Sequence, residues 1–246
     1  MDSAEVIKEL KSLATKDTRL TSKRRGVPNE TVLGVSTRAI RKLAKKLGKD
    51  DELADQLWCE DAHEAHLLAI LIAQLSEKTF DQLSRWAFDI NSWDVCDQFA
   101  KRLSESLSNV DDLVSLWTHD ETLYVRRAGL ALIANHCMKC HELENDKRQC
   151  FTSLIEQSSR DDRQHIKQAC CWALRELGKI DTETHEVATN LALELIEKGE
   201  PSSVWVGKCA YKELELLVKI PERRRLISRK SKTALEHHNS LAGLRT

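Results

Sequence analysis

Apolar residues recur every three to four positions along most of the chain, which is the spacing of amphipathic helices. In the segment from Ser36 to Lys49, Ile40, Leu43 and Leu47 share one face and charged residues fill the other. Ser36 is a suitable N-cap for that helix. The same pattern predicts further helices, at 51–60, 62–75, 77–88, 92–107, 109–118, 121–138, 142–158, 162–179, 183–198 and 202–218, and a short basic helix after Pro221.

Composition supports an all-helical fold. The chain has 246 residues, of which 41% are hydrophobic and 31% charged, the profile of a folded protein. It contains only 8 glycines and 3 prolines, whereas sandwiches, barrels and doubly wound α/β folds need many turns built from these residues. We therefore expect one helical domain over residues 1–220, followed by a basic tail at 221–246.

An internal repeat indicates how the helices are arranged. The segment Asp120–Leu130 aligns with Asp161–Cys171 at an offset of 41 residues, and Arg175–Leu177 aligns with Lys212–Leu214 at an offset of 37. A period near 40 in a helical chain is typical of HEAT and armadillo arrays, in which stacked helix pairs form a curved solenoid. The sequence thus predicts an α-solenoid with a concave groove.

Other features bear on compartment and cofactors. No apolar run approaches the about 18 residues of a membrane span, and residues 1–10 carry acids instead of a hydrophobic signal core. Eight cysteines without a signal are typical of reduced thiols. The spacing Cys137-x-x-Cys140-His141 matches haem-attachment and zinc motifs, but no second C-x-x-C accompanies it. We expect a cytoplasmic protein with no metal and no cofactor.

Charge is distributed unevenly. The net charge is −1, but residues 1–50 carry +7, residues 219–246 carry +6 and the middle carries −14. Six cations between Ser36 and Lys49 fall on one helix face, at Arg38, Arg41, Lys42, Lys45, Lys46 and Lys49. Because like charges repel, this face favours an anionic partner such as a phosphate backbone or an acidic membrane surface. An ordinary solvated helix surface is the alternative.

The basic tail supports the same two interpretations. Between Lys219 and Lys232 it carries seven cations, among them Arg223, Arg224 and Arg225, and a single acid, Glu222. It is either a phosphate-binding arm or a disordered, solvated tail.

Two aromatic-charged pairs lie at helical spacing. Trp93 and Asp97 are four residues apart and share a face, with Val95 and Phe99 on the opposite apolar side. Trp172 and Arg175 are three residues apart in a helix that ends at a C-cap glycine, Gly178. Each tryptophan is either a core residue beside a surface charge or one half of a ligand contact. An aromatic ring beside a carboxylate suits a cationic ring and a developing carbocation.

Adjacent arginines open the helix that begins near Tyr124. Arg126 and Arg127 point about 100° apart, so at most one of them can face a given groove. Ordinary surface salt bridges are the alternative role for both.

At these residues the chain resembles the AlkD-like DNA alkylation repair proteins, the HEAT-like repeat DNA glycosylases and their relatives. The resemblance is carried by Leu33-Gly34-Val35 with Arg41, and by the segments at 91–97, 124–128 and 172–179. It implies hydrolysis of the N-glycosidic bond of N3- and N7-alkylated purines in duplex DNA. We expect the protein to act as a monomer. It also implies roles for single residues: Asp97 would stabilise the sugar cation, Trp93 and Trp172 would contact deoxyribose and backbone, and Arg127 would hold a phosphate, with Arg175 as a backbone contact.

Two departures from the family pattern concern catalysis. Active members often carry two consecutive tryptophans before the aspartate, and here the first is Ser92. The aromatic residue that opens the arginine segment is Tyr124 instead of tryptophan, and we expect Tyr124 to contact DNA. A DNA-binding protein without catalysis, and a HEAT scaffold for a protein partner, therefore stay open. Because an open groove is a poor base pocket, we expect selection to rest on lesion lability and duplex contacts.

Overall fold

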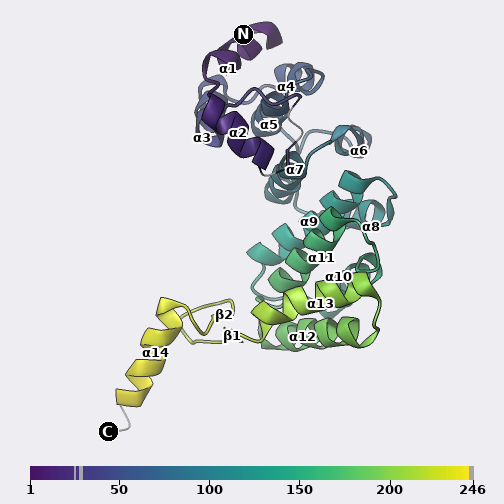
Figure 1. Ribbon diagram of the computed structural model, residues 1–246, viewed down its shortest axis with the longest axis vertical. Helices are drawn as coiled ribbons and strands as arrows, with labels where there is room; N and C mark the ends of the chain where they lie inside the picture. The colour runs from purple at the N-terminus through teal and green to yellow at the C-terminus, as the bar shows by residue number, and fades with distance from the viewer. Residues whose placement is uncertain (25, 28–29, 244–246) are drawn as a thin grey trace. The chain divides into compact units, whose positions relative to one another are not determined.

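The computed structural model describes residues 1–24, 26–27 and 30–243, with side chains up to residue 238. This part of the chain is almost wholly helical, as predicted (Figure 1). Its helices are α1 (Ser3–Ser12), α2 (Lys16–Arg24), α3 (Thr37–Leu47), α4 (Asp51–Trp58), α5 (His63–Ile72), α6 (Phe80–Asp89), α7 (Trp93–Ser106), α8 (Asp111–His119), α9 (Leu123–Lys139), α10 (Asn145–Ser158), α11 (Gln164–Leu177), α12 (Thr182–Glu197), α13 (Pro201–Leu214) and α14 (Lys232–Gly243).

The chain forms two compact units, Met1–Leu113 and Val114–Thr246. In the first, α5 packs against α3, α4 and α7. Its core includes Leu57, Leu68 and Phe99, all fully buried. Trp58 of α4 stacks on Trp86 of α6, with ring centroids 4.1 Å apart and planes within 2°. This stacking holds α4 against α6. Whether the chain acts as one domain with a basic tail stays a prediction.

Three helices form the centre of the second unit, α9, α11 and α13, and lie side by side (Figure 1). They begin at Leu123, Gln164 and Pro201, so their starts are 41 and 37 residues apart, as the repeat predicted. Helix α9 is buried on nearly every side, which is why its sequence lacks a polar face. The repeat therefore reflects helices that bury their apolar faces against their neighbours.

Gly178 ends α11, as predicted, but for a different reason. Its φ of −68° is right-handed, so the left-handed cap that favours glycine is not used. A Cβ at Gly178 would instead collide with the side chain of Leu214 in α13. The glycine permits close packing between repeats, a reason that lies in tertiary structure.

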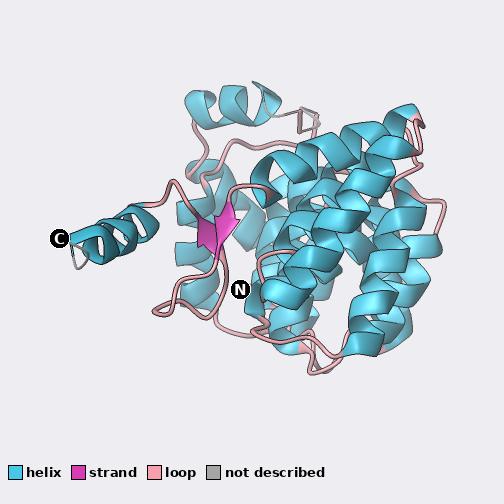
Figure 2. Ribbon diagram, turned by 90° about the horizontal axis from the view of Figure 1, so that it is seen from below, coloured by secondary structure: helices cyan, strands magenta, loops and turns pink. Residues whose placement is uncertain are grey.

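The prediction of a helix directly after Pro221 is wrong. Leu217–Val218 (β1) pairs antiparallel with Ile227–Ser228 (β2), and the next helix, α14, begins only at Lys232 (Figure 2). Between the strands, Lys219 Nζ donates to the carbonyl oxygens of Arg223 and Arg224 at 2.7 and 2.6 Å. These two carbonyl groups accept hydrogen bonds from a lysine side chain within a turn, where a helix would instead have backbone amides four residues further along donating to them.

The described helices are too short or too polar to cross a lipid bilayer.

Candidate nucleic-acid interface

Helix α3 presents the predicted basic face. The hydroxyl of Ser36 accepts a hydrogen bond from the Ala39 amide at 3.3 Å and caps the helix. Ile40 and Leu43 are buried at 1% and 3% exposure. Four cations of the opposite face are exposed to solvent: Arg38, Arg41, Lys42 and Lys45. The amphipathic helix and its orientation are as the sequence predicted.

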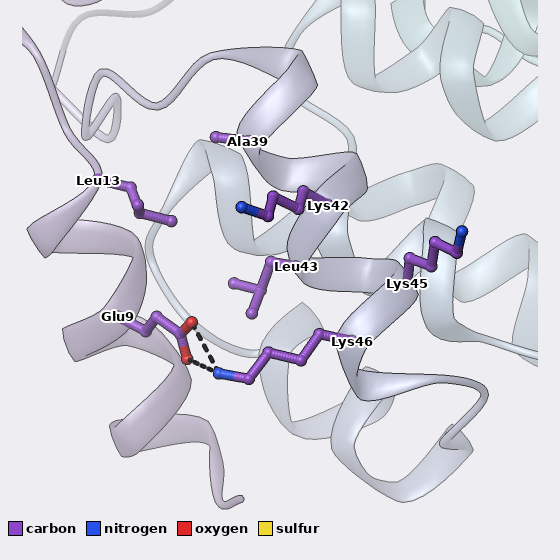
Figure 3. Close-up of a pocket in the computed structure, with 7 residues that line it drawn as sticks. All are labelled: Glu9, Leu13, Ala39, Lys42, Leu43, Lys45 and Lys46. Carbon is purple, nitrogen blue, oxygen red and sulfur yellow. Dashed lines mark hydrogen bonds and ion pairs between the residues drawn. The ribbon is translucent and has the colours of Figure 1, made fainter.

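The other two cations of that face are engaged within the protein. Lys46 Nζ binds both oxygens of Glu9 in α1, at 3.0 and 3.2 Å, whereas Lys45 points away from that pair (Figure 3). Lys49 Nζ donates to the carbonyls of Leu71 and Ala73, at 3.2 and 2.5 Å, where α5 ends. Lys49 thus complements the negative end of a helix dipole.

Arg102 of α7, which the sequence did not single out, joins the cations of α3. Together with Arg41, Lys45 and Lys49 it lines a depression of about 300 Å³, and none of the described lining residues is acidic. Burial and the nearby Arg102 charge lower the pKa of Lys49. Arg102 Nη1 bonds Glu105 at 2.6 Å, while its Nε has no hydrogen-bond partner among the described residues. Four cations around one depression form a surface that suits a phosphate.

Helix α7 carries the first aromatic-charged pair. Trp93 is its first residue and Asp97 follows one turn later; both are partly exposed. Val95 and Phe99 are fully buried, so the apolar side of the helix is the one predicted. Ser92 occupies the N-cap position but makes no capping bond. Its hydroxyl instead lies 3.5 Å from Nδ1 of His63.

His63 forms a second pair beside Trp93, one that the sequence did not reveal. Its Nε2 lies 2.9 Å from Oδ2 of Asp94, and its side chain is 5% exposed. Burial works to raise the pKa of Asp94, but the hydrogen bond and charge of His63 outweigh it and the pKa is lowered. Asp94 is therefore ionised near neutral pH. The two residues are 31 positions apart, so no local pattern signals the contact.

Glu64 shows what the Leu33-Gly34-Val35 motif does in the structure. Its buried carboxylate accepts hydrogen bonds from the amides of Leu33, Gly34 and Val35, at 2.8, 2.7 and 2.9 Å. Gly34 has a φ of +99°, and a Cβ there would lie 2.6 Å from the Thr15 carbonyl oxygen. These contacts fix the segment that leads into α3, so the motif positions the basic face.

In the second unit, Arg127 is buried. It is 5% exposed, and Nη1 donates to the carbonyl oxygen of His165 at 2.7 Å, which ties α9 to α11. The Tyr124 ring lies 5.8 Å from the His165 ring. The adjacent Arg126 pairs with Asp161 at 2.8 Å. Both arginines therefore hold neighbouring repeats together.

Arg175 also bridges two repeats. Its Nε lies 3.0 Å from Oε2 of Glu213 in α13, and Lys179 Nζ lies 2.6 Å from Oε1 of the same carboxylate. Trp172, one turn earlier on α11, is partly exposed. The predicted Trp172–Arg175 pair thus lies on a single helix, with its cation in an inter-repeat ion-pair network.

The basic tail is anchored to the second unit at Arg225 and Leu226. Arg225 Nη1 donates to the Cys137 carbonyl at 2.7 Å, and Nη2 lies 3.0 Å from Oε2 of Glu176. Leu226 is buried. Arg223 and Arg224 are exposed and keep their charges available.

The C-x-x-C-H segment is built as the end of a helix. Cys137 lies in the core of α9, and Cys140 follows its last turn. Burial raises the pKa of both thiols, which disfavours the thiolate that binds metals. Among the described residues, no group of three His, Cys, Asp or Glu side chains could hold a metal ion.

Comparisons with known proteins agree with the fold. The family model for DNA alkylation repair enzymes matches residues 6–194. Among solved structures, the chain is similar to one from a new family of proteins related to the HEAT-like repeat DNA glycosylases, with affinity for branched DNA structures. That likeness has a TM-score of 0.71 at 20% identity and covers 100% of this chain and 96% of that one. A search of curated proteins found no match. The HEAT-like repeat fold is therefore confirmed.

Proposed function

The chain belongs to the family of DNA alkylation repair enzymes, and on that premise we propose that it binds duplex DNA and hydrolyses the N-glycosidic bond of N3- and N7-alkylated purines. The observation that carries the proposal is the pair on α7. Trp93 and Asp97 are one turn apart and partly exposed, on a helix whose other side is buried. Membership of the family and the cationic depression of the same unit support a DNA ligand.

The reaction needs little acid catalysis. An N3- or N7-alkylated purine is cationic, so when the C1′–N bond breaks, the electron pair leaves with the base and neutralises it. The positive charge moves to the sugar as an oxocarbenium-like cation. The Asp97 carboxylate stabilises that cation and orients the water that adds to C1′, and the water then loses a proton. Trp93 contributes its aromatic face to the cationic centre.

The remaining residues bind DNA. Arg41 and Lys45, with Lys49 and Arg102, form a phosphate site, and Arg38 and Lys42 extend it along α3. In the second unit, Trp172 contacts the backbone, and the exposed Arg223 and Arg224 contact phosphates. Arg127 and Arg175, whose internal partners are the His165 carbonyl and Glu213, contact the DNA backbone in this proposal. The protein acts as a cytoplasmic monomer.

A DNA-binding protein without catalysis is the second candidate. Ser92 and Tyr124 stand where active members of the family often carry tryptophans. Ser92 is also fully buried, so it cannot replace an exposed aromatic ring. The solved structure of similar fold belongs to a family with affinity for branched DNA structures. On this alternative, the same cations bind DNA and no base is released.

Release of free base decides between the two candidates. The purified protein is incubated with methylated duplex DNA, and 7-methylguanine and 3-methyladenine are measured by chromatography. We expect both bases to appear. Asp97→Asn is nearly isosteric but lacks the charge, so excision should fall about 10²–10³-fold, or ~3–4 kcal/mol of barrier, with duplex affinity kept.

Asp81→Asn in α6 is the matched control, because that exposed aspartate lies outside α7; it should excise at the wild-type rate. Excision by Asp97→Asn at that rate would remove Asp97 from the mechanism. If the wild type binds duplex DNA but releases no base, the non-catalytic candidate replaces the glycosylase.

A further inference from the structure

Two neighbouring helices of the second unit, α11 and α13, each carry a cysteine at the surface where they pack together (Figure 1). Cys171 of α11 and Cys209 of α13 are 38 positions apart in the chain, and their Sγ atoms lie 2.6 Å from each other. Both are free thiols. A disulfide bond is about 2.05 Å long, so this contact is only about 0.6 Å longer than a covalent bond. Neither helix has to rearrange to close that gap.

An ion pair one turn further along keeps the two helices in register. Arg175 follows Cys171 by four residues, and Glu213 follows Cys209 by four. Arg175 Nε lies 3.0 Å from Oε2 of Glu213. The ion pair and the sulfur contact therefore join successive repeats at the same offset along the chain. The closeness of the two sulfurs is a consequence of repeat packing and does not depend on one side-chain rotation.

The two thiols differ in their access to solvent. Cys209 is partly exposed, whereas Cys171 is only 2% exposed. Burial, together with the hydrogen bond to Cys209, raises the pKa of the Cys171 thiol, which stays protonated near neutral pH. A small oxidant therefore reaches Cys209 first, and Cys171 is in place to react with the product. Redox-sensitive sites often consist of an accessible cysteine beside a second, resolving cysteine.

We propose that Cys171 and Cys209 form a redox modification site, at which a peroxide closes a reversible disulfide between α11 and α13. The Cys209 sulfur attacks one oxygen of hydrogen peroxide and the O–O bond breaks. The departing hydroxide takes up the Cys209 thiol proton and leaves as water, so that Cys209 becomes a sulfenic acid. The Cys171 sulfur then attacks the Cys209 sulfur, the S–O bond breaks, and the hydroxide leaves as water with the Cys171 proton.

The balance of the reaction is complete with these reactants. Two thiols together lose two electrons and two protons, and one peroxide is reduced to two molecules of water. A small thiol such as glutathione restores Cys171 and Cys209 by exchange through a mixed disulfide, and is itself oxidised. The modification is therefore reversible in a compartment that keeps thiols reduced.

The disulfide should stabilise the second unit. A bond between residues 38 positions apart restricts the unfolded chain and so lowers its entropy. We expect the melting temperature of the oxidised protein to rise by about 5–10 °C. This effect does not depend on base excision, so the proposal stands or falls separately from the glycosylase proposal.

Mass spectrometry of the full chain tests the proposal. Cys59→Ser and Cys150→Ser are introduced first, because these two exposed thiols can link separate molecules. Six of the eight cysteines then remain. The folded protein is treated with hydrogen peroxide, unfolded and alkylated with iodoacetamide. We expect four alkylated thiols instead of six, and trypsin without a reductant should release peptide 168–175 linked to peptide 209–212.

Two single variants in this background form a matched pair. Cys209→Ser and Cys140→Ser each remove a partly exposed cysteine. Cys209→Ser should lose the linked peptide and the rise in melting temperature on oxidation. Cys140→Ser breaks the C-x-x-C motif, yet it should form the disulfide as before, and dithiothreitol should reverse it. Circular dichroism checks the fold of both variants and measures their melting temperatures.

Several outcomes would overturn the proposal. These are alkylation of all six thiols after peroxide treatment, oxidation of Cys209 to a sulfinic acid without a link, and a link between Cys137 and Cys140. Fragmentation of the linked peptide distinguishes Cys171 from Cys170, and a link through Cys170 would also contradict it. The peptide map needs no change at Cys171 or Cys209, so it decides the question even if Cys209→Ser does not fold.

Discussion

The cations of α3 and those of the second unit have different structural roles. On α3, Arg38, Arg41, Lys42 and Lys45 are exposed, and the depression beside them has no acidic residue among its described lining. In the second unit, three arginines named as DNA contacts bind protein groups: Arg127 a carbonyl, Arg175 a glutamate, and Arg225 a carbonyl and a glutamate.

This difference shows that a cation in a repeat protein can either bind the ligand or hold neighbouring repeats together. Neighbouring HEAT-like repeats present helix ends and acids to each other, and arginine has five donors with which to satisfy them. On α3, by contrast, solvent faces most of the cations, and their mutual repulsion is relieved only by an anion. Substitutions should therefore alter stability in the second unit and DNA affinity on α3.

The largest effect is expected at Arg127. Arg127→Ala removes a buried guanidinium that joins α9 to α11 and should lower the free energy of unfolding by about 2–3 kcal/mol. Urea denaturation followed by circular dichroism measures the change. Arg38→Ala, an exposed cation of α3, should stay within about 0.5 kcal/mol of the wild type. Equal stability of both variants would contradict the claim that cations stabilise the fold in the second unit but not on α3.

Charge reversal on α3 should give the converse result. Arg41→Glu, Lys42→Glu and Lys45→Glu together should weaken duplex binding about 10²-fold and reduce the slope of log affinity against log salt by about 3, since about one unit is lost with each phosphate contact. Fluorescence anisotropy at several salt concentrations measures both. Stability should hardly change because these side chains are exposed. Wild-type affinity in this variant would place the DNA elsewhere.

The smallest effect is expected at Lys46, which belongs to the basic face by sequence but pairs with Glu9. Because Lys46 is 62% exposed, Lys46→Ala should cost no more than about 0.5 kcal/mol of stability. It should also weaken DNA binding less than Lys45→Ala does, which anisotropy on the two single variants can test. A larger affinity loss for Lys46→Ala would show that DNA displaces Glu9.

Much of the architecture followed from local patterns. The predicted helices from 51 to 218 lie within a few residues of α4 to α13, and the 41- and 37-residue offsets match the starts of α9, α11 and α13. The predicted buried sides of α3 and α7 are those observed. The prediction of a helix directly after Pro221 was wrong because the Lys219 side chain and the pairing of β1 with β2 form a turn there. Such contacts leave no periodic pattern in the sequence.

The sequence by itself determined the helices, their repeat and the shared face of Trp93 and Asp97, because each depends on residues a few positions apart and on the fixed geometry of a helix. Only the tertiary structure decided which cations are engaged and which polar groups surround Trp93. Arg175 meets Glu213 and His63 meets Asp94 across more than thirty residues of chain. Such contacts are fixed by how repeats stack, since burial obliges each polar group to find a partner wherever the fold brings one.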